Sequence, residues 1–343
     1  MKSLQNLTIT NHFHTLGEHF YKEVQPQGLK NPEIIKTNSE AAVLLNLDPS
    51  EFNSDLFLQV FSGNTLLPNS VPLAHDYAGH QLGNFNPFLG DGRALLLFDV
   101  ETDNGLCEVN LKGSGKTPYA REFDGRASLS VCLHEYEMSV KLASLGIPTT
   151  QSLCIIAGDE QIYRKQFERA AILTRIAPGF IRFGTFENYY FQRNVEALRQ
   201  LTHFVIRHYY PECFSQEEYD YVLFLRQVVI KTAHLIAHWQ AVGFVHGMLN
   251  TDNQSILGVT LDLGESSFTE SFDPEFVSST NDEKGRYAFG QQPVIGLWNC
   301  NVLARALSPL ISDDKLKNAL ESYETEYLKH YEMLTGNNGT ESN

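Results

Sequence analysis

The sequence predicts an α+β fold in which a β-rich first half is followed by a helical second half. Strand-like apolar runs bounded by turn residues are concentrated before residue 178, whereas from about residue 190 apolar side chains recur at helical spacing. The chain has 343 residues, 42% of them hydrophobic, which is enough for two lobes with sizeable cores. We therefore expect an N-lobe with an N-terminal extension at 1–178 and a C-lobe at 179–343.

The elements of the first half follow from local patterns. The run NSEAAVLLNLD at 38–48 has a short helical pattern, and the strand-like runs RALLLFDV and CEVNLKG are separated by the turn TDNG. Residues 127–145 predict a longer helix, ended by Gly146 and Pro148. Its expected apolar stripe consists of positions 129, 133, 136, 140 and 143. Strands are predicted again near 152–176.

The second half is predicted to contain long helices. Residues 222–243 are strongly apolar, as expected for a central buried helix. The segment from Asp313 onward is predicted to form one further helix. The residues on its expected face are Leu316, Leu320, Tyr323, Tyr327 and Tyr331.

The charge and the amino-acid composition exclude some classes of function and partner. Lys and Arg number 26 and Asp and Glu 41, giving a formal charge of −15. This charge disfavours nucleic acid and anionic membranes as partners, although a local basic pocket could still bind one nucleotide. The start MKSLQNLTIT contains no secretory signal, and no apolar run is long enough to span a membrane. Five scattered cysteines without a C-x-x-C pair indicate reduced thiols, so we expect a cytoplasmic protein.

The stretch VHGMLNTDNQSILGVTLDLG at 245–264 carries the strongest chemical signal. Protein kinases share the pattern H-R-D-x-x-x-x-N followed by D-F-G. His246, Asn253 and Asp262 occupy the matching positions, but Met248 stands where the kinase has its catalytic Asp. Asn253 and Asp262 offer hard oxygen ligands suited to Mg²⁺ beside phosphates. An Asx-rich turn would explain the TDN tripeptide alone, but it explains the whole spacing poorly, so a nucleotide-metal site is favoured.

Two features of the first half fit the same interpretation. Gly90, Gly92 and Arg93 lie just before a strand, where they form either an Asp-Gly hairpin turn or a bare turn that approaches phosphates. Lys112 ends an apolar strand, and Glu135 follows on the first long helix, as the kinase strand lysine and its helix glutamate do. Any strand Lys and helix Glu could also form such a pair.

Several basic residues could form a local anion site. Arg175 and Arg182 lie in the stretch TRIAPGFIRFG, where they could clamp phosphate or simply donate to backbone carbonyls. If the fold gathers them, the members of the anion site are Arg93, Lys112, Lys116, Arg121, Arg126, Arg175 and Arg182.

In several long blocks the chain resembles the SelO (selenoprotein O, YdiU) family of kinase-like protein adenylyltransferases. The blocks run in the family's order between about residues 13 and 311. They are LAHDYAGHQLGNFNPFLGDGRALLL, LKGSGKTPYAREFDGRA, LGIPTTQSL, LTRIAPGFIRFGTFE, HWQAVGFVHGMLNTDNQSILGVTLDLG and KGRYAFGQQPVIGLWN. The family's usual C-terminal segment is not found after them.

The resemblance implies a two-lobed protein-kinase-like (pseudokinase) fold and a transferase activity. Family members bind ATP in a flipped orientation and transfer AMP to Ser, Thr or Tyr hydroxyls of proteins, with Mg²⁺ or Mn²⁺ and release of diphosphate. Transfer of UMP from UTP is a variant of this reaction. In this pose Met248 is no obstacle, because Asp252 is the implied proton acceptor.

The resemblance also implies roles for the other positions. Asn253 and Asp262 would hold the metal, with Asp262 also at the nucleotide. The residues implied to contact or support the nucleotide are Gly90, Gly92, Arg93, Lys112, Glu135, Asp124, Gly125, Arg175 and Arg182.

The sequence departs from the family pattern at a few positions. Lys116, Val140 and Leu263 stand where typical members have Arg, Glu and Tyr. Ser278, in DPEFVSSTND, stands where members carry a cysteine implied to form a regulatory disulfide with the C-terminal segment. Two alternatives stay open, a nucleotide-binding scaffold with weak or no activity and, less favoured because of Met248, an ordinary kinase.

Overall fold

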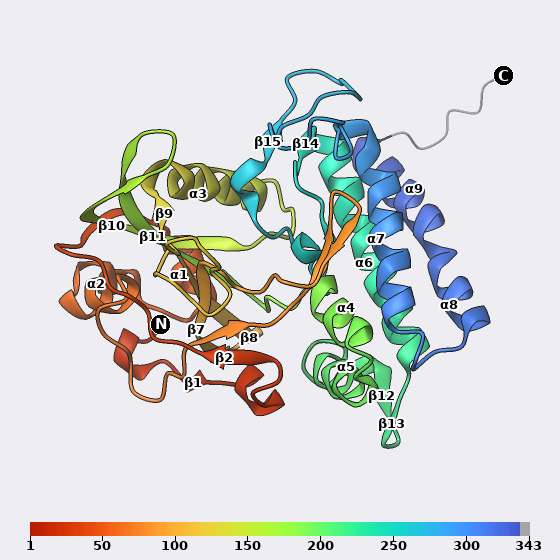
Figure 1. Ribbon diagram of the computed structural model, residues 1–343, viewed down its shortest axis with the longest axis horizontal. Coiled ribbons are helices and arrows are strands. Elements are labelled where there is room, and N and C mark those ends of the chain that lie inside the picture. The colour runs from red at the N-terminus through yellow and green to blue at the C-terminus, as the bar shows by residue number, and fades with distance from the viewer. Residues whose placement is uncertain (337–343) are drawn as a thin grey trace. The chain divides into compact units, whose positions relative to one another are not determined.

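The computed structural model describes residues 1–336, so the last seven residues of the predicted C-lobe lie outside the described residues (Figure 1). The chain forms two compact units. Unit 1 consists of Met1–Tyr77, Phe88–Leu145 and Thr149–Phe180, and unit 2 consists of Ala78–Pro87, Gly146–Pro148 and the chain from Ile181. Unit 1 holds a large sheet and unit 2 is mainly helical, which confirms the α+β class with a β-rich first half.

Unit 1 is built on an antiparallel sheet of nine strands. Its main order is β2-β4-β7-β8-β11-β10-β3, with β1 paired to β7 and β9 to β11. The strands are β1 Ile9–Thr10, β2 Tyr21–Glu23, β3 Glu33–Thr37, β4 Leu73–His75, β7 Ala94–Thr102, β8 Gly105–Lys112, β9 Ala127–Ser128, β10 Gln151–Tyr163 and β11 Phe167–Ala177. The hairpin predicted around TDNG is confirmed, because β7 and β8 pair up to Thr102 and Gly105.

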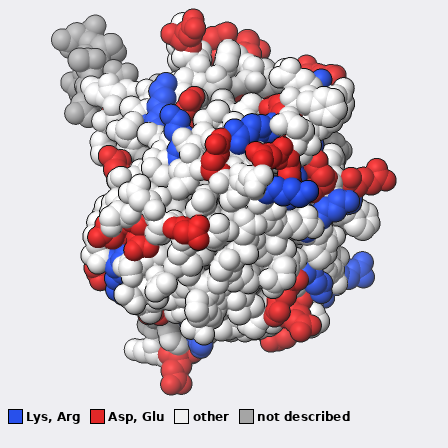
Figure 2. All heavy atoms as spheres, turned by 90° about the vertical axis from the view of Figure 1, so that its left-hand side faces the viewer, with Lys and Arg blue, Asp and Glu red and all other residues white. Residues whose placement is uncertain are grey.

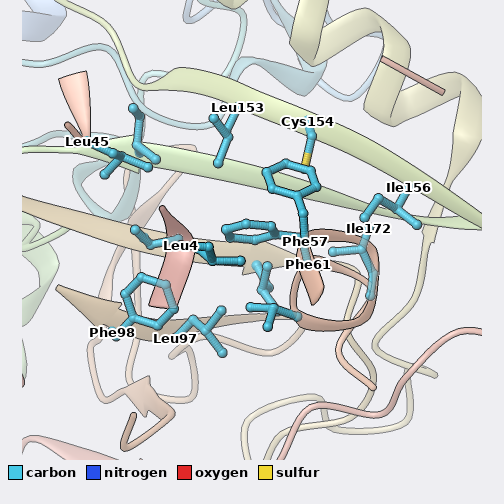
Figure 3. Packing of buried hydrophobic residues seen from close by; sticks show 14 of the residues in the cluster. Leu4, Leu45, Phe57, Phe61, Leu97, Phe98, Leu153, Cys154, Ile156 and Ile172 are labelled. Carbon is cyan, nitrogen blue, oxygen red and sulfur yellow. The ribbon is translucent and has the colours of Figure 1, made fainter. Parts of the chain in front are cut away.

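Three α-helices belong to unit 1, and each begins at a polar cap. They are α1 Ser39–Leu44, α2 Asp55–Phe61 and α3 Leu129–Ser144, whose capping side chains are Asn38, Ser54 and Ser128. Helix α2 contributes Phe57 and Phe61 to the main core, where they lie among aliphatic side chains of the sheet (Figure 3). Burial of such large apolar surfaces is the main source of stability of this unit.

The predicted apolar stripe of α3 is confirmed in part: Leu129, Leu133 and Tyr136 are partly buried and pack against a core cluster, but the most buried positions are their neighbours on the helix. The residues that the helix buries are Cys132, Glu135, Ser139 and Leu142, whereas Val140 is 37% exposed. Polar Glu135 and Ser139 have partners in the sheet region, so they face inward although a hydrophobicity pattern places them outside. Tertiary hydrogen bonds and an ion pair thus decide which face of α3 is buried.

Unit 2 is organised around a long apolar helix. Its helices are α4 Phe183–Phe191, α5 Val195–Tyr209, α6 Tyr221–Val242, α7 Gln292–Ala306, α8 Asp313–Leu320 and α9 Ser322–Thr335. Helix α6 matches the predicted buried helix at 222–243 and packs against α7, α8 and α9 (Figure 1). The single helix predicted from Asp313 is two helices, because the chain turns at Glu321.

Short elements complete the two units. The two-stranded pairs are β5 Gly79–Gln81 with β6 Asn84–Asn86, β12 Phe214–Ser215 with β13 Glu218–Tyr219, and β14 Phe244–Val245 with β15 Ser267–Phe268. The 3-10 helices are η1 Leu4–Asn6, η2 Phe13–Leu16, η3 Pro49–Asn53, η4 Pro211–Cys213, η5 Thr251–Asn253, η6 Leu263–Glu265 and η7 Phe289–Gln291.

The distribution of charged side chains on one face of the molecule agrees with the negative net charge of the sequence. On the face shown in Figure 2, acidic and basic side chains are interspersed and form no continuous basic area. None of the helices within residues 1–336 combines the length and apolar character that crossing a membrane requires.

The β5–β6 hairpin contains a strained residue. Gln81 pairs with Asn84, so Leu82 and Gly83 are the two central residues of the turn. Both have positive φ, 49° at Leu82 and 83° at Gly83, which is the pattern of a type I′ turn. Leucine rarely adopts this conformation, because its Cβ crowds the following carbonyl.

We predict that Leu82→Asn stabilises the protein, since asparagine tolerates the left-handed region. The expected gain in free energy of unfolding is about 0.5–1 kcal/mol, measured as a rise in the thermal unfolding midpoint. Leu328→Asn is the matched control, because Leu328 is 47% exposed but lies within α9, where asparagine lowers helix propensity. A fall in midpoint for Leu82→Asn, like that expected for the control, would contradict the strain argument.

Candidate active site

A buried ion pair in unit 1 joins the sheet to α3. Lys112 ends β8, and its Nζ donates to Oε1 of Glu135 on α3, as the sequence predicts. The exposed fractions of the two residues are 4% and 2%. A buried charge pair is costly unless it is well paired, and a lysine on a strand bound to a glutamate on a helix is the arrangement by which protein kinases hold ATP phosphates.

Two arginines lie near this ion pair. Lys112, Arg93 and Arg175 all act electrostatically on Cys132, although burial dominates and raises the pKa of its thiol to about 12. Arg175 is 3% exposed, and its Nε and Nη2 donate to Oδ1 of Asn110 at 3.2 and 2.8 Å. The structure therefore brings three of the predicted anion-site cations together in unit 1.

The Gly90–Gly92 turn is closely packed. Gly90 has φ +97°, and a Cβ there would lie 2.5 Å from the ring of Tyr119. A Cβ on Gly92 would lie 2.9 Å from the Tyr119 carbonyl oxygen. The turn leads into β7, which pairs with β1, β4 and β8, so the alternative of an Asp-Gly hairpin turn is wrong. Both glycines are thus required by packing.

Asp124 and Gly125 lie in a loop that Arg164 holds in place. Arg164 Nη1 and Nη2 donate to the two carboxylate oxygens of Asp124, each at 2.8 Å, and hydrogen bonding from Arg164 is the main cause that lowers the pKa of Asp124. A Cβ on Gly125, where φ is +71°, would lie 2.1 Å from the Gly115 carbonyl oxygen. Arg164 was not predicted from the sequence, because it lies far away at the tip of the β10–β11 hairpin.

In unit 2, His246 shapes the segment that contains the kinase-like pattern. It is fully buried, its Nε2 donates to the Leu261 carbonyl at 2.7 Å, and its Nδ1 accepts from the Met248 amide at 3.3 Å. These partners require the neutral form, and burial lowers the pKa of His246 in agreement with that. His246 thereby joins the start of the segment to the residue just before Asp262.

Asp252 presents a buried carboxylate with one unoccupied oxygen. Its Oδ2 accepts from Gln81 Nε2 at 3.1 Å, whereas its Oδ1 is buried and has no hydrogen-bond partner in any other residue of 1–336. Burial raises the pKa of Asp252 to about 7, against the opposing effects of Arg182 and Gln81. Such a carboxylate is suited to accept a proton near neutral pH.

Asp262 and Asn253 fit a divalent cation by their chemistry. Asp262 lies in the left-handed region with φ 54°, and its Oδ2 accepts from Arg182 Nη1 at 2.5 Å. Asn253 donates from Nδ2 to the Met248 carbonyl at 2.9 Å, which leaves its amide oxygen as a possible ligand. Among residues 1–336 no group of three or more His, Cys, Asp and Glu side chains is placed to hold a metal. Phosphate oxygens and water would therefore have to complete the shell, as is usual for Mg²⁺.

Arg182 connects these residues instead of standing free for phosphate. Besides Asp262, its Nη1 donates to the Asp252 carbonyl oxygen at 2.6 Å. Arg182 is also the residue that precedes the first turn of α4. The predicted site residues thus fall into two groups. Arg182, Asp252, Asn253 and Asp262 are together in unit 2, and the other predicted site residues belong to unit 1.

The sequence interpretation missed a supporting network in unit 2. Tyr287 donates to Oδ1 of buried Asn250, and the Leu82 amide lies 3.1 Å from that oxygen and 2.9 Å from the Tyr287 hydroxyl. Together with Gln81, these contacts fix the β5–β6 hairpin against the η5 turn. The block AGHQLGNF contains Gln81 and Leu82 of this network, but the spacing of its residues does not predict which of them contact η5.

Known proteins match this chain over nearly its full length. The family profile described as "Protein adenylyltransferase SelO" matches residues 3–338. The protein nucleotidyltransferase YdiU of Thiobacillus denitrificans is 45% identical over 332 residues, which cover 96% of this chain and 68% of that protein. The YdiU protein of Ectopseudomonas mendocina is 42% identical with the same coverage.

One solved structure, the Toxoplasma gondii specific rhoptry antigen kinase domain, aligns with 78% of this chain and 84% of its own at 11% identity and a TM-score of 0.31. The profile match and the two sequence relatives, by contrast, agree with the blocks from which the resemblance was inferred. The chain therefore belongs to the SelO family of protein adenylyltransferases.

Proposed function

We propose that this chain transfers AMP from ATP to Ser, Thr or Tyr hydroxyls of proteins and releases diphosphate, with UMP transfer from UTP as a variant. Nucleotidyl transfer itself follows from membership of the SelO family. The observation that carries the finer proposal is Asp252, a buried carboxylate with an unoccupied oxygen directly before Asn253, in a segment with Met248 at the kinase base position.

Unit 1 would supply charge to the phosphates. Lys112, held by Glu135, and nearby Arg93 and Arg175 provide positive charge in a chain whose net charge is −15. Phosphoryl transfer needs positioning and charge neutralisation more than covalent help from the protein. We propose that unit 1 is the nucleotide-binding lobe and that the Gly90–Gly92 turn and the Asp124–Gly125 loop contribute backbone contacts to the nucleotide.

Unit 2 would hold the metal and the acceptor hydroxyl. Asn253 and Asp262 would bind Mg²⁺ or Mn²⁺, which when bound neutralises charge on the phosphate oxygens. Asp252 Oδ1 would accept the proton of the acceptor hydroxyl as that oxygen attacks the α-phosphorus of ATP. The bond from the α-phosphorus to the bridging oxygen then breaks and diphosphate leaves. Gln81 keeps Oδ2 engaged, which leaves Oδ1 for the hydroxyl.

We predict that the protein becomes labelled from ATP carrying label at the α-phosphate and not from ATP labelled at the γ-phosphate. The reason is that Met248 cannot act as a kinase base, whereas Asp252 serves a flipped nucleotide. Autoradiography of the purified protein, with Mg²⁺ or Mn²⁺, measures both incorporations. Strong γ-label incorporation would establish a kinase instead, and ATP binding without either transfer would establish a scaffold.

We predict that Asp252→Asn and Asp262→Asn lose different properties, because Asp252 is the proposed base and Asp262 is a proposed metal ligand. Loss of the base in Asp252→Asn should lower the transfer rate about 10²–10⁴-fold while ATP affinity stays within about twofold. Asp262→Asn should also abolish transfer, and in addition it should remove the Mg²⁺-dependent part of ATP affinity, measured by calorimetry. Asp314→Asn, at an exposed position of α8, is the matched control. Wild-type turnover in Asp252→Asn would reject its assigned role.

Activity is predicted to be indifferent to dithiothreitol. All five cysteines are buried and free, and burial is the main cause that raises the pKa of each thiol to about 12. Such thiols are poor nucleophiles and oxidise slowly. Transfer rates with and without reductant should agree within about twofold. A several-fold rise on reduction, accompanied by a mobility shift on non-reducing electrophoresis that Cys300→Ser removes, would reveal a thiol switch.

A further inference from the structure

A small cavity lies in unit 2 beside the β5–β6 hairpin. It is formed by β5, α4 and α7, and its volume is about 230 Å³. That volume is below the roughly 300–1,000 Å³ of sites for drug-sized ligands, so it suits a single large side chain. The lining residues are His80, Glu187, Tyr190, Phe191, Trp298, Asn301, Val302, Arg305 and Ala306.

Glu187 gives this cavity a buried acceptor without a donor. The residue is fully buried, and its Oε2 is bound by Nδ1 of His80. Its other oxygen, Oε1, is buried and has no hydrogen-bond partner among the described residues. A buried carboxylate oxygen left unsatisfied is costly, so the cavity favours an occupant that brings a hydrogen-bond donor.

The remaining lining selects against charged occupants. The walls are largely aromatic, with His80 and Trp298 in edge contact at 5.4 Å between ring centroids. Arg305 lines the cavity as an exposed residue, and Arg286, although it does not line the cavity, places its guanidinium 4.7 Å from the ring centroid of the lining residue Trp298. These two cations repel a lysine or arginine side chain, and the Glu187 carboxylate repels an acidic one. A neutral aromatic side chain with a donor at its tip satisfies both conditions.

We propose that this cavity binds a tyrosine side chain of the acceptor protein, whose hydroxyl donates to Oε1 of Glu187. The assignment of the tyrosine to an acceptor protein rests on the proposed function, whereas the cavity's preference for tyrosine does not. Because its hydroxyl is engaged with Glu187, the bound tyrosine is an anchor and is not the group that is modified.

The hairpin explains why an anchor here would help the reaction. Successive strand residues point to opposite faces, so on β5 His80 lines the cavity while Gln81 binds Asp252. The His80 amide also donates to Oγ1 of Thr251 at 2.7 Å. Two adjacent residues of β5 thus connect the cavity with Asp252, and a protein chain that is anchored in the cavity and passes around the hairpin would bring a hydroxyl to Asp252 for attack.

Binding of N-acetyl-L-tyrosinamide to the purified full chain tests the cavity directly. The fluorescence of Trp298, excited where tyrosine does not absorb, is the readout, since the second tryptophan, Trp239, is 1% exposed. We expect a saturable change with tyrosinamide and at least about tenfold weaker binding of N-acetyl-L-phenylalaninamide, which lacks the donor. Equal binding of the two amides, or tighter binding of N-acetyl-L-argininamide, would overturn the proposal.

Three variants test the site and separate loss of binding from loss of the fold. Val302→Phe fills the cavity from α7 and should abolish tyrosinamide binding, whereas Val294→Phe, at a 63% exposed position of the same helix, should leave it unchanged. Glu187→Gln, if it folds, should weaken tyrosinamide about tenfold and leave phenylalaninamide unaffected. Undiminished binding to a folded Val302→Phe protein would place the tyrosine site elsewhere.

Transfer is measured separately, as self-labelling from α-labelled ATP. If tyrosinamide binds but wild-type protein shows no transfer, the proposed function fails and the cavity assignment stands. If transfer occurs but tyrosinamide does not bind, the cavity assignment alone fails. When both hold, tyrosinamide should compete with labelling of an added protein acceptor such as casein, and Val302→Phe should remove that competition.

Discussion

The segment 245–264 of unit 2 depends on the contacts that the guanidinium of Arg182 makes with it. Through Nη1 the guanidinium binds the carboxylate of Asp262 and the backbone carbonyl of Asp252, so one buried cation joins two residues that are ten positions apart. Arg182 also precedes the first turn of α4, and the path of the chain into that helix is therefore fixed together with the segment. Losing one partner of a buried charged contact is far more costly than losing an exposed one.

Unit 1 also contains a buried charged contact, between Lys112 and Glu135, at a position where apolar side chains would otherwise pack. Such a pair contributes little to stability compared with well-packed hydrophobic residues, so its presence on the buried face of α3 is better explained by chemistry than by folding. The sheet and the α2 core carry the stability of this unit instead, through side chains such as Phe57 and Phe61 (Figure 3).

Much of the fold and part of the candidate site could be predicted from the sequence, and the predictions that failed did so for physical reasons. Local patterns were sufficient for the β7–β8 hairpin, for α6 and for the extent of α3. The buried face of α3 was found only in part, because the ion pair of Glu135 with Lys112 turns a polar position inward, and the break at Glu321 was missed because no Gly or Pro marks it. In the candidate site, motif spacing pointed to Lys112, Asn253 and Asp262, whereas Asp252 came from the family resemblance, and the role of each stays a prediction. Spacing could not find Arg164 or Gln81, which reach their partners only through tertiary folding.

The burial of all five cysteines offers a way to detect local opening of the structure. A thiol that solvent cannot reach is alkylated only when its surroundings open, so its modification rate reports the frequency of that opening. Cys107, Cys132 and Cys154 belong to unit 1, and Cys213 and Cys300 belong to unit 2. The order in which the cysteines become alkylated, followed by mass spectrometry, would show which unit opens first. The native cysteines can therefore report local opening in each unit without added labels.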